Sequence, residues 1–323
     1  PCQHELAPVF TTTNVASDQN QLMMETMKKV AEKHGLYCLL HEKPFAGING
    51  SGKHNNWSLS TDRGANLLDP GSTPSENGQF MLFLTAVIAA VNEHQDLLRL
   101  SVASAGNDHR LGANEAPPAI VSVFLGEELE EVIESLIKGV KYNGNGKRTM
   151  KLGVDTLPEL PKDTTDRNRT SPFAFTGNKF EFRMVGSSFS LAGPNIILNT
   201  IVADVLGRYA DELEKAADFN AALHDLVVRE IKKNKRILFN GNNYSEEWAK
   251  EAEKRGLYNF RTAAEALPHF ADKENIALFE RNGVFTAREV VTRTEIMLEN
   301  YCKVLNIEAL TMIEMAKKDI YPA

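Results

Sequence analysis

A glycine-rich stretch between Phe45 and Ser60, FAGINGSGKHNNWSLS, has the composition of a ligand-binding segment. Gly47, Gly52 and Lys53 come within one residue of the spacing of a phosphate-binding P-loop, but His54 stands where that motif needs Ser or Thr. A P-loop must also open a helix whose N-terminal amides hold phosphate. The residues that follow His54 alternate like a strand instead, so we reject the P-loop and predict a strand.

That strand sorts its side chains into two sets, because successive side chains point to opposite faces. One face carries His54, Asn56 and Ser58, and the other carries Asn55, Trp57 and Leu59. The glycines before the strand allow the backbone to approach a ligand closely. We therefore expect polar chemistry on the face of His54.

A second strand is predicted over KFEFRM, Lys179 to Met184. Alternation places Lys179, Glu181 and Arg183 on one face and Phe180, Phe182 and Met184 on the other. Taken alone, this triplet favours an ordinary half-solvated strand. The opening residues QHE form a third candidate strand, in which Gln3 and Glu5 share a face.

If the three strands are neighbours, their polar faces together indicate a metal-dependent site. Glu5, His54 and Glu181 supply oxygen and imidazole ligands that suit Mg²⁺ or Mn²⁺. Arg183 and Lys179 could hold carboxylate or phosphate. This combination favours phosphoryl transfer to a carboxylate, in which metal and cations neutralise the charge between two anions.

Five stretches resemble the motifs of glutamine synthetases and occur in that family's order. They are the segment ending in Glu5, NGSGKH at 49–54, HRLGANEAP at 109–117, Arg167-Asn-Arg169 and Glu181-Phe-Arg183. The residues of the segment KPFAGINGSGKHNNWSL and the long helical C-terminal region resemble the type III branch. The resemblance implies an α+β fold, with a curved antiparallel sheet, helices on its outer side, the site on its concave face and a helical extension.

The resemblance also implies a role for each matched residue. For metals, Glu5 would ligate one ion, and His54 with Glu181 a second ion against the ATP phosphates. For catalysis and glutamate binding, the matched residues are Glu115, Arg110, Arg183, Asn49 and Gly50. Glu115 would close over the site and take a proton from ammonium. For the nucleotide, they are Ser58, Asn56, Arg167 and Lys179.

The activity implied is ATP-dependent ligation of ammonia to the glutamate side chain through γ-glutamyl phosphate, with two or more Mg²⁺ or Mn²⁺ sites. The implied partners are glutamate, ammonium, ATP and further copies of the chain in a ring, by resemblance a dodecamer. Two positions depart from the family pattern. Asn56 stands where many relatives have a second histidine. Lys179 replaces an arginine, and a lysine cannot form the bidentate pair of hydrogen bonds to phosphate that an arginine forms.

Composition excludes several other classes of protein. The formal charge of -7 over 323 residues gives no support to nucleic-acid binding. There is no apolar run long enough to span a membrane. Cys2, Cys38 and Cys302 lack CxxC spacing, which argues against a thiolate zinc site and indicates a reducing compartment, the cytoplasm.

The pattern predicts two regions, a catalytic domain over 1–240 and a helical type III extension over 241–323. Helices are expected at 17–35, 75–104, 128–138 and 194–217, with a final helix of about thirty residues capped by Thr286. Segments 106–118 and 141–171 are expected to be long loops. A stripe of Val290, Met297, Tyr301 and Leu305 along the last helix indicates packing or an oligomer contact.

Because the chain begins at Pro1, we interpret it as an excerpt of a longer protein. The resemblance then implies that an N-terminal β-domain and the first metal-site carboxylates are missing, and that the isolated chain has little or no synthetase activity. Two alternatives stay open. One is a related ligase that couples glutamate to another amine, such as a polyamine, and the other is a non-catalytic subunit for assembly or regulation.

Overall fold

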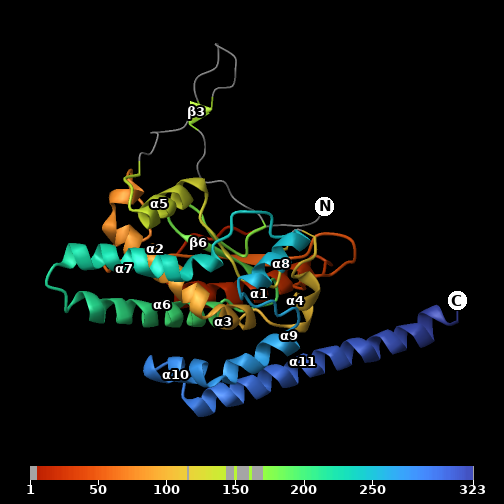
Figure 1. Ribbon diagram of the computed structural model, residues 1–323. Helices are drawn as coiled ribbons and strands as arrows, with labels where there is room; N and C mark the ends of the chain where they lie inside the picture. The colour runs from red at the N-terminus through yellow and green to blue at the C-terminus, as the bar shows by residue number, and fades with distance from the viewer. Residues whose placement is uncertain (1–5, 115, 143–148, 151–159, 162–169, 323) are drawn as a thin grey trace.

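A computed structural model describes residues 6–114, 116–142, 149–150, 160–161 and 170–322. It shows a mixed α+β arrangement, which confirms the expected fold class (Figure 1). The main sheet has the strand order β1-β6-β5-β2. Its strands are β1 (Gly52–Trp57), β2 (Val123–Phe124), β5 (Phe173–Phe175) and β6 (Phe180–Gly186). A separate short ladder pairs β3 (Thr149–Met150) with β4 (Leu160–Pro161).

The sheet is antiparallel except at one edge, where the sequence expectation was wrong. β6 pairs antiparallel with both β1 and β5, but β2 pairs parallel with β5. A parallel pair needs a long crossover connection, and the chain between β2 and β5 includes a whole helix, α5 (Glu127–Lys138). Local alternation cannot reveal the direction of a two-residue strand.

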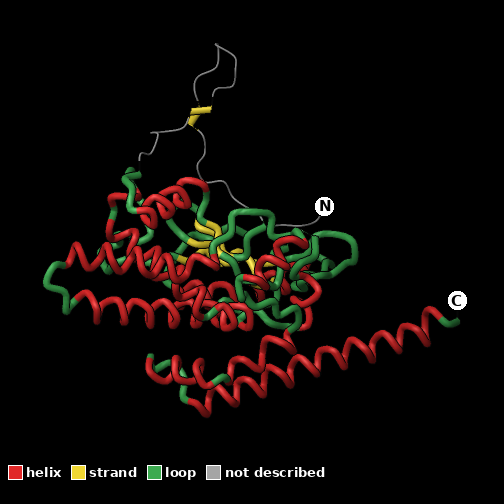
Figure 2. The backbone as a smooth tube through the Cα atoms, viewed as in Figure 1, coloured by secondary structure: helices red, strands yellow, loops and turns green. Residues whose placement is uncertain are grey.

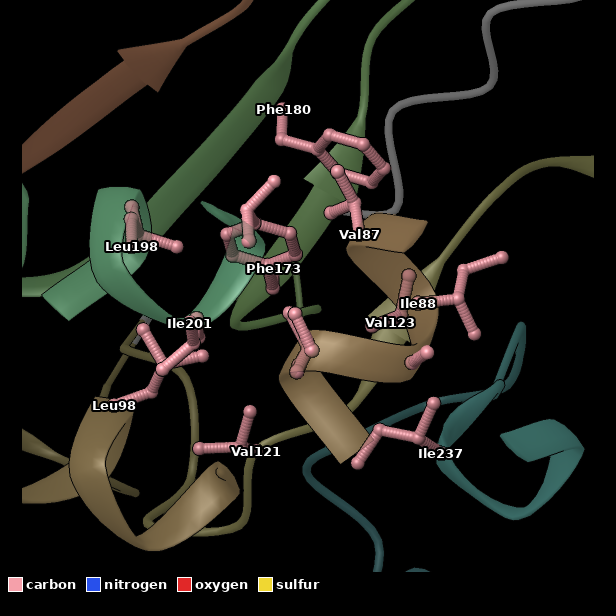
Figure 3. Close-up of a cluster of buried hydrophobic side chains, with 14 of the residues drawn as sticks. Val87, Ile88, Leu98, Val121, Val123, Phe173, Phe180, Leu198, Ile201 and Ile237 are labelled. Carbon is pink, nitrogen blue, oxygen red and sulfur yellow. The ribbon is translucent and has the colours of Figure 1, made fainter. Parts of the chain in front are cut away.

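The hydrophobic core lies against the phenylalanine face of the sheet. Phe173 and Phe180 stack with their ring centroids 4.8 Å apart, and Phe182 meets Phe173 edge to face at 5.9 Å. Figure 3 shows the rings of Phe173 and Phe180 beside aliphatic side chains from three helices and from a short 3₁₀ turn. Fully burying one such side chain contributes about 1.5–3 kcal/mol. This packing fixes which face of β6 turns toward the core.

Helices cover the core side of the sheet and surround its edges (Figure 2). The bounds up to residue 237 are α1 (Thr13–Lys33), η1 (Pro74–Glu76), α2 (Gly78–Glu93), α3 (Gln95–Leu100), α4 (Ala105–Arg110), α6 (Ala192–Leu213), α7 (Phe219–Asn234) and η2 (Lys235–Ile237). Two asparagines of α6 hold β1: Asn195 accepts from Asn55 and Asn199 accepts from the Trp57 indole, both at 2.9 Å. The polar face of β1 is therefore turned away from α6.

Several predicted helix boundaries were wrong by a turn or more. The first helix begins four residues before Ser17, whose hydroxyl bonds back to the Thr13 carbonyl inside the helix at 2.8 Å instead of capping it. The segment 75–104 is broken at His94, whose dihedral angles are not helical. The first five residues of the expected loop 106–118 are helical, because Ser104 caps α4 by accepting from Asn107.

The described part of 241–322 carries helices as its only named elements. These are α8 (Glu246–Lys254), α9 (Ala263–Ala266), η3 (Leu267–Ala271), α10 (Lys273–Arg281), α11 (Ala287–Met315) and the π-helical η4 (Ala316–Ile320). Thr286 and Glu289 form a reciprocal capping box at the start of α11, which confirms the predicted cap and length. Along the predicted stripe, Val290 is buried but Leu305 is 38% exposed. Figure 1 shows the C-terminal half of α11 extending beyond the rest of the molecule.

An ion-pair cluster joins α10 to α6. Asp204 of α6 is nearly buried and receives two donors from Arg281, from Nε and from Nη2, the latter at 2.9 Å, and a third from Asn282 at 3.0 Å. Burial opposes ionisation, but these hydrogen bonds and the charges of Arg281 and Arg208 hold the pKa of Asp204 below its usual value. Within the described ranges, no helix is long and apolar enough to cross a membrane.

Candidate active site

The predicted polar faces of β1 and β6 form one continuous surface. Asn56 pairs directly with Glu181 across the two strands, so both side chains lie on the same face. The register slips between Lys53 and Asn55, where β6 carries one extra residue in a bulge opposite His54. His54 and Asn56 are exposed whereas Asn55 and Trp57 are buried, which confirms the predicted alternation.

An ion pair between Glu181 and Arg183 runs along this surface. Arg183 donates from Nε at 2.9 Å and from Nη2 at 2.7 Å, both to Oε2 of Glu181. The side chain of Glu181 is only 14% exposed and that of Arg183 only 5%. This burial shows that the strand is not the ordinary half-solvated one that its charge pattern alone would favour. The second carboxylate oxygen of Glu181 receives neither of these hydrogen bonds.

The glycine-rich segment before β1 closes over a buried arginine of α4. Arg110 is 4% exposed and donates to the main-chain oxygens of Arg183 at 3.0 Å and Met184 at 3.2 Å. A Cβ atom on Gly52 would overlap its guanidinium, and one on Gly50 would lie 3.1 Å from its Cγ. The predicted close approach of the glycine backbone is therefore made to a side chain of the protein itself.

The charged guanidinium of Arg110 is buried away from solvent. Burial lowers its pKa from the normal arginine value, and the neighbouring charge of Glu42 works in the opposite direction. Because arginine stays protonated at any physiological pH, the consequence is a buried cation whose donors are fixed on β6. The same contacts attach α4 to the bulge that faces His54.

The residues predicted for the nucleotide lie around the other end of β1. The Ser58 hydroxyl is 2.8 Å from Oδ1 of Asn66 and 3.0 Å from the main-chain oxygen of Asn178. Lys179 follows Asn178 directly and is half-buried. Ser58 therefore contacts the turn between β5 and β6 that contains Asn178 and Lys179, and the exposed Asn56 lies two residues before Ser58 on β1.

Three predicted site residues, Glu5, Glu115 and Arg167, lie outside the described residues. The neighbours of Glu115 are nevertheless placed: Asn114 donates to the Gly47 carbonyl at 3.2 Å, and Gly112 donates to the Pro117 carbonyl at 2.9 Å. The loop that carries Glu115 therefore borders the glycine-rich segment. Asn49 is exposed and Gly50 half-buried on that segment.

The donor set fits a hard or borderline divalent cation in part. His54 offers an exposed imidazole nitrogen and Glu181 a half-buried carboxylate oxygen on the same face, which are ligand types suited to Mn²⁺ and acceptable to Mg²⁺. Within the described ranges, no three His, Cys, Asp or Glu side chains gather into a metal-binding group. The third predicted ligand, Glu5, lies outside those ranges.

Sequence reasoning missed one residue that the structure places at the centre of this region. Glu42 lies in an irregular segment, is 3% exposed, and accepts a hydrogen bond from the Ser188 amide at 3.0 Å. A single glutamate in a segment without periodicity gave no signal. The nearby half-buried Lys53 has its pKa lowered to about 8 by burial, against the opposing charge of Glu42.

Two family models match the two ends of the chain. The glutamine synthetase catalytic domain matches residues 1–120, and the glutamine synthetase C-terminal domain matches residues 222–323. Together with curated relatives that match over the whole chain, these show that the chain belongs to the glutamine synthetase family. Its branch is type III, since it is 50% identical, over 100% of its length, to the type-3 glutamine synthetase of Dictyostelium discoideum.

Two further glutamine synthetases match at similar levels. Identity is 52% to that of Butyrivibrio fibrisolvens and 46% to that of Bacteroides fragilis, over 99% and 100% of this chain. The chain spans 44%, 46% and 45% of the Dictyostelium, Butyrivibrio and Bacteroides proteins, less than half of each.

A solved structure of a GmaS/ADP complex supports the fold. It covers 92% of this chain and 53% of the GmaS chain with a TM-score of 0.50 at 17% identity. At that identity the likeness concerns the fold alone. The α+β fold predicted from the sequence is therefore supported by an independent comparison.

Proposed function

We propose that this chain provides part of the active site of an ATP-dependent glutamate–ammonia ligase that makes glutamine through γ-glutamyl phosphate. The observation that carries the proposal is the strand register, which puts His54, Asn56 and Glu181 on one face with Arg183. A second support is that the curated relatives matching the whole of this chain are glutamine synthetases. The whole protein's activity is our inference from these two findings.

We infer that Arg183 and Arg110 serve the glutamate side of the reaction. Arg183 donates from two nitrogens to one carboxylate oxygen of Glu181, which supports the proposal that it can also bind the carboxylate of glutamate. Arg110 is held under Gly50 and Gly52, so its charge lies below the segment where Asn49 and Gly50 would contact the amino-acid end of glutamate. Two cations near one anionic substrate would lower the cost of bringing it to ATP.

We infer that the nucleotide lies toward the Ser58 end of the same face. Ser58, Asn56 and Lys179 would contact ATP there, and Arg167 would join them. Asn56 can donate a hydrogen bond but carries no charge, so its phosphate contact is weaker than that of a histidine. Lys179 would act as a point charge.

A divalent metal held by His54 and Glu181, with a further ion on Glu5, would supply charge neutralisation for the phosphates. The glutamate carboxylate would attack the terminal phosphate of ATP, and ADP would leave. Ammonia would then attack γ-glutamyl phosphate at its carbonyl carbon, and phosphate would leave. Glu115 would take the proton released from ammonium, since its loop borders the glycine-rich segment through Asn114.

Two wider features remain part of the proposal. The catalytic domain would extend over 1–240 and the helical extension over 241–323, and the whole protein would assemble as a ring of identical subunits. The long apolar stretch of α11 supports an assembly role for the extension, because Ile307 is 63% and Met312 65% exposed. The cytoplasm would be the compartment.

The test is phosphate release from ATP by the complete protein that contains this chain, with glutamate, ammonium and divalent metal omitted in turn. We expect release to need all three and to fall at least a hundredfold in Glu181→Gln. Glu25→Gln, which removes an exposed carboxylate on α1, is the matched control and should keep full activity. Release that ignores ammonium but responds to another amine would favour the related ligase, and no release would favour the non-catalytic subunit.

A further inference from the structure

Glu42 connects the glycine-rich segment to the end of β6. Its main-chain oxygen accepts from the Ser51 amide at 2.8 Å. Its carboxylate oxygen Oε1 accepts from the Ser188 amide at 3.0 Å and also from the Ser188 hydroxyl. A carboxylate that accepts from backbone amides forms stronger, charge-assisted hydrogen bonds than a neutral acceptor. One residue thus holds two segments that are far apart in sequence.

Three glycines make room for this glutamate. A Cβ atom would lie 2.6 Å from the Glu42 main-chain oxygen if added to Gly50, 2.5 Å from Oε2 if added to Gly106, and 2.6 Å from Cγ if added to Gly186. None of the three has a positive φ, so backbone conformation does not require glycine at these positions. The space that Glu42 occupies is what requires it.

The carboxylate also lies among the cations of the proposed site. Its charge acts on Arg110, which is 4% exposed, and on the half-buried Lys53 at the start of β1. Within the described residues, Arg110 forms no ion pair closer than 4.0 Å, and its donors go to uncharged oxygens. Glu42 is therefore placed to balance a buried cation without contacting it directly.

We propose that Glu42 is a positioning residue for glutamate: its hydrogen bonds and its bulk hold the segment 49–52 over Arg110. This proposal rests on the proposed function, because it assumes that Asn49 and Gly50 bind glutamate. Glu42 itself is buried beneath that segment and does not touch the substrate. It acts through the residues that do, by fixing the backbone on one side to Ser51 and on the other to Ser188.

The test compares Glu42→Ala with Glu42→Gln in the complete protein. In Glu42→Ala we expect the KM for glutamate to rise about tenfold or more, with kcat and the KM for ATP within threefold of the wild type. Glu42→Gln keeps the length of the side chain and an acceptor oxygen for Ser188, so it should restore the KM for glutamate to within threefold. If Glu42 only stabilised the fold, Glu42→Ala would lower the unfolding temperature without raising the KM for glutamate relative to the KM for ATP.

Amide hydrogen exchange provides a readout that needs no catalysis. The Ser188 amide, whose acceptor is the Glu42 carboxylate, should exchange at least tenfold faster in Glu42→Ala and close to the wild-type rate in Glu42→Gln. The Ser51 amide donates to the main-chain oxygen of Glu42, which both variants keep, so its exchange reports whether the segment 49–52 loosens when the carboxylate is lost. Wild-type exchange in Glu42→Ala would overturn the proposal, as would an unchanged KM for glutamate. If Glu42→Ala does not fold, Gly106→Ala displaces the same carboxylate and should raise the KM for glutamate in the same way. If the wild-type enzyme shows no glutamate-dependent turnover, the proposed function is refuted. The amide exchange measurement does not depend on turnover and still tests whether Glu42 holds the segment 49–52.

Discussion

The fit between Gly52 and Arg110 can be tested by adding one methyl group. A Cβ atom at position 52 would overlap the guanidinium and lie 2.9 Å from its Nε, so the arginine must move. Moving it breaks hydrogen bonds to the carbonyl of Arg183 at 3.0 Å and of Met184 at 3.2 Å. Hydrogen bonds that involve a charged group contribute about 1.5–3 kcal/mol each, and a buried charge left uncompensated costs about 3–5 kcal/mol. We expect Gly52→Ala to destabilise the chain by about 3–5 kcal/mol.

Urea unfolding of the 323-residue chain measures this effect, with the fluorescence of the buried Trp57 and Trp248 as the signal. Gly207→Ala is the matched control, because its new Cβ meets nothing within 4 Å on an exposed helical position. It should stabilise the chain by roughly 0.5–1 kcal/mol through helix propensity.

A double-mutant cycle isolates the contact itself. In an Arg110→Ala background, Gly52→Ala should cost under about 1 kcal/mol, because the group that it displaces is absent. Equal costs in the two backgrounds would refute the reasoning, as would a cost below about 1 kcal/mol in the wild type. Either result would mean that Gly52 is not required by Arg110.

Two further predictions concern acid stability and the extent of the active site. The pKa of Asp204 is lower in the folded chain than the unfolded value of about 3.9, so its pairing with Arg281 stabilises the fold above about pH 4 and this contribution disappears as pH falls through the folded pKa. Because Arg281 is about half exposed and would be solvated without its partner, Asp204→Asn should cost about 1–3 kcal/mol at pH 7 and clearly less at pH 3, measured by urea unfolding, and an equal cost at both pH values would contradict this. The isolated 323-residue chain should release little or no phosphate from ATP in the presence of glutamate and ammonium, whereas the complete protein should release it; normal turnover by the isolated chain would show that its site is complete.

Local patterns were sufficient to predict the strands that carry the site. In β6, the alternation of Phe180 and Phe182 with Glu181 fixes which face is buried, because a phenylalanine side chain gains free energy only in the core. In the same way, α11 starts where Thr286 caps it, and the capping box pairs Thr286 with Glu289, only three residues further along the chain. Such features depend on neighbours in sequence, so the sequence alone contains them.

Contacts between distant segments were not predictable in this way. The parallel pairing of β2 with β5 depends on how the chain returns after α5. The burial of Arg110 depends on a bulge of β6 more than seventy residues away, and its match to the family's substrate arginine indicated only a function. The position of Glu42 depends on Gly106 and Gly186, which lie far from it in sequence and leave the space for its carboxylate, so no local pattern indicates it.

The most direct test of the site is Mn²⁺ binding by the complete protein, followed by electron paramagnetic resonance. We predict that His54→Gln and Glu181→Gln each weaken the same one of the Mn²⁺ sites at least tenfold, because both side chains belong to one face of the β1–β6 pair. His34→Gln and Glu25→Gln, at exposed positions, are the matched controls and should leave every site unchanged. Wild-type Mn²⁺ binding in both site variants would contradict the account, since this face would then not be where the metal binds.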